Sequence, residues 1–251
     1  MSLPTWALLL LAAFLAGVVN SVAGGGTLLT FPTLLSAGIP PIVANATSTV
    51  ALVPGSLGAA LGYRDEMKAA GAEIWTLGIP SLVGGVLGAV LVMRVGDASF
   101  AKLVPFLLYA ATALFLLQPL VKRALDRRTT QLPRWVLPLF QLVVATYGGF
   151  FGAGIGILML AAMGVVLASA SIHRLNGFKN LAAGSINGVA AVTFALSGRV
   201  LWPVALAMAA ASMAGGYLGA GIAKRIGERV VRGFVVVVGV SMATFMLLRR
   251  T

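Results

Sequence analysis

Two short apolar segments, each entered through a run of glycines, decide how this chain folds. The first lies in residues 24–38, GGGTLLTFPTLLSAG, and the second in residues 152–170, GAGIGILMLAAMGVVLASA. A helix that crosses a bilayer needs about 20 consecutive apolar residues, and the apolar parts of these segments, 27–38 and 155–170, are shorter. Short, glycine-interrupted segments at matching places in two halves of a membrane chain are typical of a transporter's binding site.

Composition places the whole chain in a membrane. Of its 251 residues, 59% are hydrophobic and only 10% are charged, and the mean hydropathy is +1.01. Soluble domains carry about 25% charged residues, and a globule of this size would expose much of its apolar surface to water. The 31 glycines suit close helix packing in lipid. The pairs Gly84/Gly88 and Gly215/Gly219 are expected to form such packing seams.

The rest of the chain divides into apolar stretches long enough to span the bilayer. Together with the two short segments they predict an all-α polytopic membrane protein with eight full spans, the short segments being glycine-broken or re-entrant. The expected spans are residues 4–23, 41–63, 72–93, 98–119, 133–151, 174–197, 201–223 and 229–248.

Charged residues indicate the orientation of the chain and exclude several functions. The net charge of +12 is spread over short loops and forms no single basic face, so we exclude nucleic acid as a partner. Basic clusters in residues 122–132 and 224–232 are expected on the cytoplasmic side of the cell membrane. With no Cys, one His and six acidic residues, the chain is expected to hold no metal and no cofactor.

The two halves of the chain resemble each other. SLVGGVLGA at residues 81–89 recurs as SMAGGYLGA at 212–220, and the same offset of 131 aligns Asn45 with Asn176. A constant offset over this length indicates duplication. Five segments in each half, an odd number, would invert the second half, as in many secondary transporters; an eight-crossing arrangement with a cytoplasmic C-terminus stays open. The predicted parts are a first repeat in residues 1–121, a basic linker in 122–132 and a second repeat in 133–251.

Motifs in both halves carry a resemblance to a known family. The first half has GGGTLLTFP at 24–32, GIPP at 38–41 and NATST at 45–49, and the second has GAGIG at 152–156 and NGFKNL at 176–181. In this order, over nearly the whole chain, the sequence resembles the TauE/SafE family of membrane permeases, also called the sulfite-exporter family. The resemblance implies export or uptake of sulfite, sulfonates and related organic anions.

Helix physics separately predicts an anion site at the two breaks. A helix that restarts inside the membrane turns its N–H groups and positive dipole end toward the cavity that covers the break. The breaks are expected at Gly24, Gly25, Gly26, Gly152, Gly154 and Gly156. The side chains expected to bind the substrate are Thr27, Thr30, Asn45, Thr47, Ser48, Thr49, Asn176, Lys179, Asn180 and Asn187.

Lys179 is the candidate on which the anion hypothesis depends most. It lies inside an apolar segment, where a charge is costly unless it is partnered, and all six acidic residues lie in or beside loops. A small anion is a partner that such a lysine can take. The alternative is that Lys179 lies near a helix end and reaches toward the lipid headgroups. His173 and Arg174, just before this helix, are expected at the membrane interface.

Several alternatives stay open from the sequence alone. With no Asp, Glu or His relay expected in the membrane, the potential alone could drive anions out, at about 2.3 kcal/mol per charge per 100 mV. Coupling to protons through bound water or substrate stays open. The competing functions are a non-transporting membrane assembly protein and an intramembrane enzyme that pairs Ser185 with His173, which are twelve residues apart. Asn20 and Ser56 suit either substrate contact or helix packing. The choice of anion and a homo-oligomeric state are equally open.

Overall fold

Ten helices make up the part of the chain that the structure describes, with no strand among these residues. The computed structural model describes residues 1–22, 24–62, 71, 73–126, 133–167, 170, 172–226 and 228–248. The predicted all-helical class is therefore confirmed. The helices are α1 (Leu3–Val22), α2 (Thr27–Ser36), α3 (Pro41–Gly62), α5 (Glu73–Val95), α6 (Asp97–Asp126), α7 (Val136–Phe150), α8 (Ile155–Val166), α9 (Ile172–Leu196), α10 (Trp202–Ile226) and α11 (Glu228–Leu248).

The two segments that follow the glycine-rich breaks are short helices, as predicted. α2 has 10 residues and α8 has 12, whereas a full crossing takes about 20. Among the described residues, three stretches are long and apolar enough to cross a membrane: Leu3–Ser21, Glu73–Val95 and Asp97–Leu117. α3 and α9 have 22 and 25 residues but carry most of the polar candidate residues, which lower their hydropathy. The count of eight full spans therefore stays a prediction.

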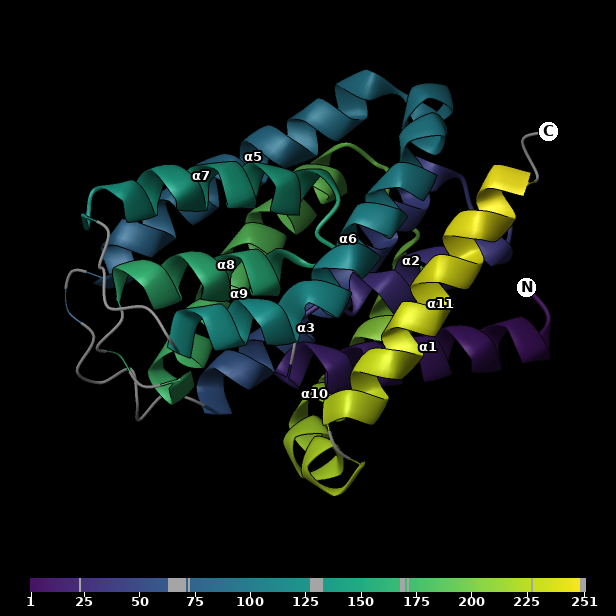
Figure 1. Cartoon of the computed structure of the whole chain (residues 1–251). Coiled ribbons are helices and arrows are strands. Elements are labelled where there is room, and N and C mark those ends of the chain that lie inside the picture. The colour runs from purple at the N-terminus through teal and green to yellow at the C-terminus, as the bar shows by residue number, and fades with distance from the viewer. Residues whose placement is uncertain are drawn as a thin grey trace.

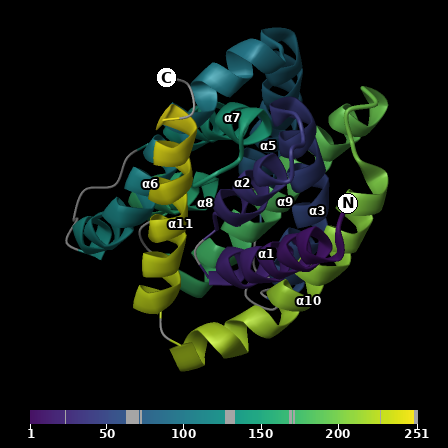
Figure 2. The ribbon, with the colours of Figure 1, turned by 90° about the vertical axis from the view of Figure 1, so that its right-hand side faces the viewer.

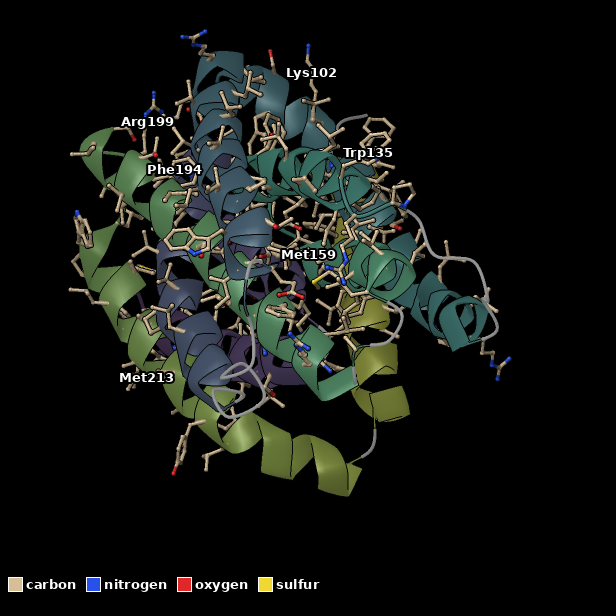
Figure 3. All side chains as sticks on the ribbon, turned by 90° about the vertical axis from the view of Figure 1, so that its left-hand side faces the viewer. Lys102, Trp135, Met159, Phe194, Arg199 and Met213 are labelled. Atoms are coloured by element: carbon tan, nitrogen blue, oxygen red, sulfur yellow. The ribbon has the colours of Figure 1, made fainter. Side chains whose placement is uncertain are left out.

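Side chains are distributed as lipid requires. Large apolar side chains cover the exterior, for example Trp75 and Leu196, which are 71% and 85% exposed, whereas the polar side chain of Asn45 is fully buried. Figure 3 shows Lys102 and Arg199 together at one end of the molecule. An apolar exterior is unfavourable in water and favourable against lipid tails.

Glycines bring two pairs of helices into backbone contact. α5 lies along α7, and α1 lies along α10 (Figures 1 and 2). A Cβ atom on Gly84 would lie 2.8 Å from a backbone nitrogen of α7, and one on Gly88 would overlap the same helix. A Cβ on Gly215 would overlap the carbonyl oxygen of Phe14 in α1. These three glycines therefore form packing seams, as predicted; the surroundings of Gly219 lie outside the described residues.

The two short helices lie in the middle of the molecule. α2 packs on α1 and α3, α8 packs on α7 and α9, and α3 and α9 pack on each other. α11 lies along α6 in both views (Figures 1 and 2), and these two helices contact α2 and α8 from outside. This arrangement brings the two breaks, which are far apart in the sequence, into the same part of the interior.

The start of α3 is bonded to two other segments. The Oδ1 atom of Asp97 accepts a hydrogen bond from the backbone N–H of Ile42, and its Oδ2 atom accepts one from Arg199, both at 3.0 Å. The hydroxyl oxygen of Thr47 accepts a hydrogen bond from the backbone N–H of Leu201 at 3.1 Å. These bonds hold the connection between α9 and α10 against the first turns of α3.

Candidate functional site

The first break is held in shape by an asparagine. Gly24 and Gly25 have φ angles of 69° and 146°, values that favour glycine. The side-chain oxygen of Asn20 accepts hydrogen bonds from the backbone N–H groups of Gly25 and Gly26, both at 2.8 Å. Gly25 also has no room for a side chain, because a Cβ atom would overlap the ring of Phe115. Asn20 thus satisfies two backbone donors that lipid cannot satisfy.

The second break is held by Tyr147. Gly152 and Gly154 have φ angles of 80° and 79°. The Tyr147 hydroxyl donates to the carbonyl oxygen of Ala153 at 2.8 Å, and the Tyr147 carbonyl oxygen accepts from the N–H of Gly152 at 3.3 Å. α8 then begins at Ile155 with no side-chain cap. The positive end of its dipole is therefore available to a ligand.

The two breaks meet at a small cavity. A Cβ atom on Gly24 would lie 3.2 Å from the Cα of Gly156, and one on Gly152 would lie 3.6 Å from the hydroxyl oxygen of Thr27. The cavity between them has a volume of about 20 Å³, room for one water molecule. α1, α2, α3, α8 and α9 all contribute to its wall, which consists of Asn20, Gly24, Gly25, Thr27, Leu52, Ser56, Gly152, Ile155, Gly156, Lys179, Asn180, Ala183 and Asn187.

Lys179 and Asn180 supply the cavity with hydrogen-bond donors that lack an acceptor. The two residues are 1% and 3% exposed, and within the described part of the chain neither the Lys179 Nζ nor the Asn180 Nδ2 has a hydrogen-bond partner. An unsatisfied buried donor is unfavourable by about 1–3 kcal/mol, and a charged one by more. The cavity wall contains no acidic residue among those described, and Glu73 is paired with Arg174 at 3.8 Å. These groups therefore suit an anion.

The predicted site residues divide into two groups. Within the wall are the candidates Thr27, Lys179, Asn180 and Asn187, with the break glycines Gly24, Gly25, Gly152 and Gly156. Outside the wall are Thr30, Asn45, Thr47, Ser48, Thr49 and Asn176, while Gly26 and Gly154 adjoin wall residues in the sequence.

Most of the candidates outside the wall connect or stabilise helices. The hydroxyl groups of Thr30 and Ser48 share a hydrogen bond of 2.6 Å between α2 and α3. The Nδ2 atom of Asn45 donates to the carbonyl oxygen of Phe150 at the end of α7, at 3.0 Å. Thr49 donates to a carbonyl oxygen of its own helix at 2.9 Å. In this conformation these side chains position α3, and a contact of theirs with substrate stays a prediction.

The wall also contains Asn20 and Ser56, whose roles the sequence leaves open. The repeat offset of 131 pairs Ser56 with Asn187 and Leu52 with Ala183, and all four residues line the cavity. Because Asn187 is a predicted site residue, the repeat offset indicates that its counterpart Ser56 also lines the site. Asn20 has no such signal, because its role depends on the path of the chain through the break.

The two halves differ at the residues that carry the donors. The offset pairs Lys179 with Ser48 and Asn180 with Thr49. Ser48 and Thr49 are engaged with Thr30 and with α3 itself, whereas their counterparts on α9 line the cavity. The second half alone therefore contributes a positively ionisable side chain to the wall.

Ser185, the serine of the enzyme alternative, lies away from this cavity. It lines an apolar groove of about 140 Å³ between α5 and α9, together with Phe178 and Leu181. Its hydroxyl donates to the carbonyl oxygen of Leu181 at 3.0 Å. A serine nucleophile needs a base within hydrogen-bond reach, and no titratable residue is among those lining the groove in the described chain. The side chain of His173 lies outside the described residues.

The long apolar helices suit a membrane, and known relatives of the chain are named as membrane transporters. The chain is 33% identical to a "Probable membrane transporter protein" of Haemophilus influenzae, over 96% of this chain and 94% of that protein. It is 31% identical to "Probable membrane transporter protein ORF9" of a Sinorhizobium species, over 96% and 92%. It is 32% identical to "Probable membrane transporter protein YfcA" of Escherichia coli strain K12, over 95% and 88%.

The family follows from a match over most of the chain. Residues 9–246 match the sequence profile of the family described as "Sulfite exporter TauE/SafE". The protein belongs to this family, and the resemblance seen in its motifs is confirmed.

Proposed function

We propose that this protein is a secondary transporter that carries a small anion, sulfite or an organosulfonate, across the cell membrane. One observation carries the proposal. Lys179 Nζ and Asn180 Nδ2, both buried and both without an acceptor in the described chain, lie where the two broken segments meet. Hydroxyl groups of Thr27 and Ser56 and the start of α8 lie in the same wall. This set of donors matches the oxygens of a sulfite or sulfonate group.

The size of the cavity supports a mechanism of alternating access. A volume of about 20 Å³ holds one water molecule, and a sulfite ion is larger. Substrate entry therefore requires the helices around the cavity to move apart. Five helices from both halves of the chain form the wall, so movement of these helices relative to one another opens the site.

The pattern of helix packing supports two equivalent repeats, and five segments in each half would give them inverted topology. If residues 1–121 and 133–251 are equivalent, α1, α2, α3, α5 and α6 correspond to α7, α8, α9, α10 and α11. The contact of α1 with α10 then corresponds to that of α7 with α5, and the contact of α2 with α11 to that of α8 with α6. All four contacts are present. Residues 122–132 then form a basic cytoplasmic linker in a multi-pass protein of the inner membrane.

Anion binding by the purified protein tests this function. We expect sulfite or methanesulfonate to raise the apparent stability, by about 2.7 kcal/mol at a ligand concentration 100 times Kd. In Lys179→Met, which keeps the volume of the side chain and removes its charge, this stabilisation should disappear. Lys102→Met is the matched control, because Lys102 is exposed on α6 and does not line the cavity. Equal stabilisation of the wild type and Lys179→Met would remove Lys179 from the site, and no stabilisation of the wild type would contradict the function.

A further inference from the structure

Lys179 is isolated among neutral helices. α1, α2, α3 and α8, which complete the cavity wall with α9, contain no ionisable side chain along their whole lengths. At the position equivalent to Lys179, the first half has Ser48, which is neutral and bonded to Thr30. The protein therefore brings one positive charge to the cavity and no fixed charge to balance it.

The remaining neighbours of α9 also leave Lys179 without a counter-charge. α5 and α7 pack on α9. The ionisable residues of α5 are Glu73, paired with Arg174 at 3.8 Å, and the basic Arg94. The ionisable residue of α7 is Tyr147, whose hydroxyl donates to the carbonyl oxygen of Ala153. None of these side chains lies in the cavity wall.

In this position the charge of the Lys179 side chain depends on whether a substrate anion is bound. An ammonium group inside the membrane is unfavourable without an anion or acceptor beside it, and in the described chain the Nζ atom has no acceptor. The charge is thus compensated only while an anion is in the cavity. When the anion leaves, the ammonium group can release its proton to the water that has entered, before the cavity closes again.

From this geometry we infer that the protein moves one proton together with each anion, and that Lys179 is the residue that binds the proton. The inference rests on the proposed anion transport. On the loading side, the neutral amine takes one proton from water as the anion binds, forming an ammonium–anion pair. On the opposite side, the anion and the proton are both released, and the amine is neutral again.

This coupling changes the expected driving force. A monoanion moving with one proton transfers no net charge, so the membrane potential does not drive it. The sequence alone favours a flux driven by voltage, because it shows no acidic or histidine relay in the membrane, and it leaves proton coupling through bound water or substrate open. A lysine whose only counter-charge is the substrate takes the place of such a relay.

Proton uptake on binding is the first test, with methanesulfonate as the probe because a sulfonate stays ionised across the neutral pH range. Wild-type protein in weakly buffered detergent solution should take up close to one proton per bound anion at alkaline pH. If one proton is taken up with each anion, the affinity for methanesulfonate should fall about tenfold for each unit by which the pH rises over that range. Binding without proton uptake overturns the inference and leaves the transport function intact. Absence of methanesulfonate and sulfite binding overturns the transport function itself.

Flux measurements in vesicles give a second, independent readout. For the wild type, an inward gradient of methanesulfonate should acidify the lumen, and a potassium diffusion potential should leave the rate unchanged. In Lys179→Arg, whose guanidinium stays charged, exchange of labelled for unlabelled anion should persist while net flux is lost. Lys102→Arg, at the exposed lysine of α6, should behave as the wild type. Net flux by Lys179→Arg, or a wild-type rate that follows the voltage, contradicts the coupling; if Lys179→Arg does not fold, the wild-type readouts decide.

Discussion

Replacing Asn20 by alanine should destabilise the protein by removing the acceptor at the first break. The Asn20 oxygen accepts from the N–H groups of Gly25 and Gly26 at 2.8 Å each. Each unsatisfied buried donor is unfavourable by about 1–3 kcal/mol, and the adjoining cavity can supply one water molecule to one of them. With one donor left unsatisfied, we expect Asn20→Ala to lower the free energy of unfolding by about 1–3 kcal/mol.

Titration with sodium dodecyl sulfate in mixed micelles measures this difference. The neighbouring Ser21 provides the control, because its hydroxyl donates at 2.8 Å to the carbonyl oxygen of Val18 in its own helix. Ser21→Ala should change the stability by less than about 1 kcal/mol, because that carbonyl keeps its backbone partner. Asn20→Asp retains the acceptor and should keep the stability, but its carboxylate would lie in the wall with Lys179 and displace anions. Wild-type stability of Asn20→Ala would refute the role given to Asn20.

Three further predictions concern single positions. Gly25→Ala should destabilise the protein by about 1–3 kcal/mol from backbone strain alone, and its methyl group would also overlap the Phe115 ring. Replacing the Phe115 ring in the same variant should relieve the overlap but not the strain, and thermal unfolding of both variants measures the two effects. Ser56→Ala should lower anion affinity roughly fivefold, the effect of one lost hydrogen bond, and leave the melting temperature unchanged; equilibrium binding decides. Arg199→Ala should lower the free energy of unfolding by at most about 1 kcal/mol, because its ion pair with Asp97 is formed by side chains that are 48% and 39% exposed. A larger loss of stability in mixed micelles would contradict this and give the pair a major role in holding the fold.

The helices and the break positions could be predicted from the sequence because they depend on local chemistry. Glycine runs, apolar segment lengths and the polar start of α3 are visible in the printed sequence, and α2 and α8 begin at Thr27 and Ile155 as expected. Lys179 could also be singled out, because a charge inside an apolar segment stands out against its neighbours.

The direction of the polar side chains could not be predicted in the same way. In a soluble helix the apolar stripe shows which face is buried, but a helix in lipid is apolar on both its outer and inner faces. Nothing local therefore shows that Ser48 turns toward Thr30 while its counterpart Lys179 lines the cavity. Asn20 was left open for a related reason, since its oxygen bonds residues five and six positions ahead, across a turn that only the folded chain defines.

The two halves contribute equivalent positions to the cavity wall but different charges. Ser56 and Asn187 occupy equivalent positions in the wall, as do Leu52 and Ala183, so the repeats share one frame. The donors differ, and Lys179 has a neutral counterpart. A single cation in the wall is enough to pair with a monoanion.

Transport of radiolabelled sulfite into vesicles that contain the purified protein shows whether the anion crosses by way of Lys179. The wild type and Lys102→Met should both transport sulfite well above protein-free vesicles, and Lys179→Met, inserted in equal amount and folded, should fall to the protein-free rate. Transport by Lys179→Met at the wild-type rate would contradict the proposed role of Lys179, because it would show that the anion crosses without the buried lysine.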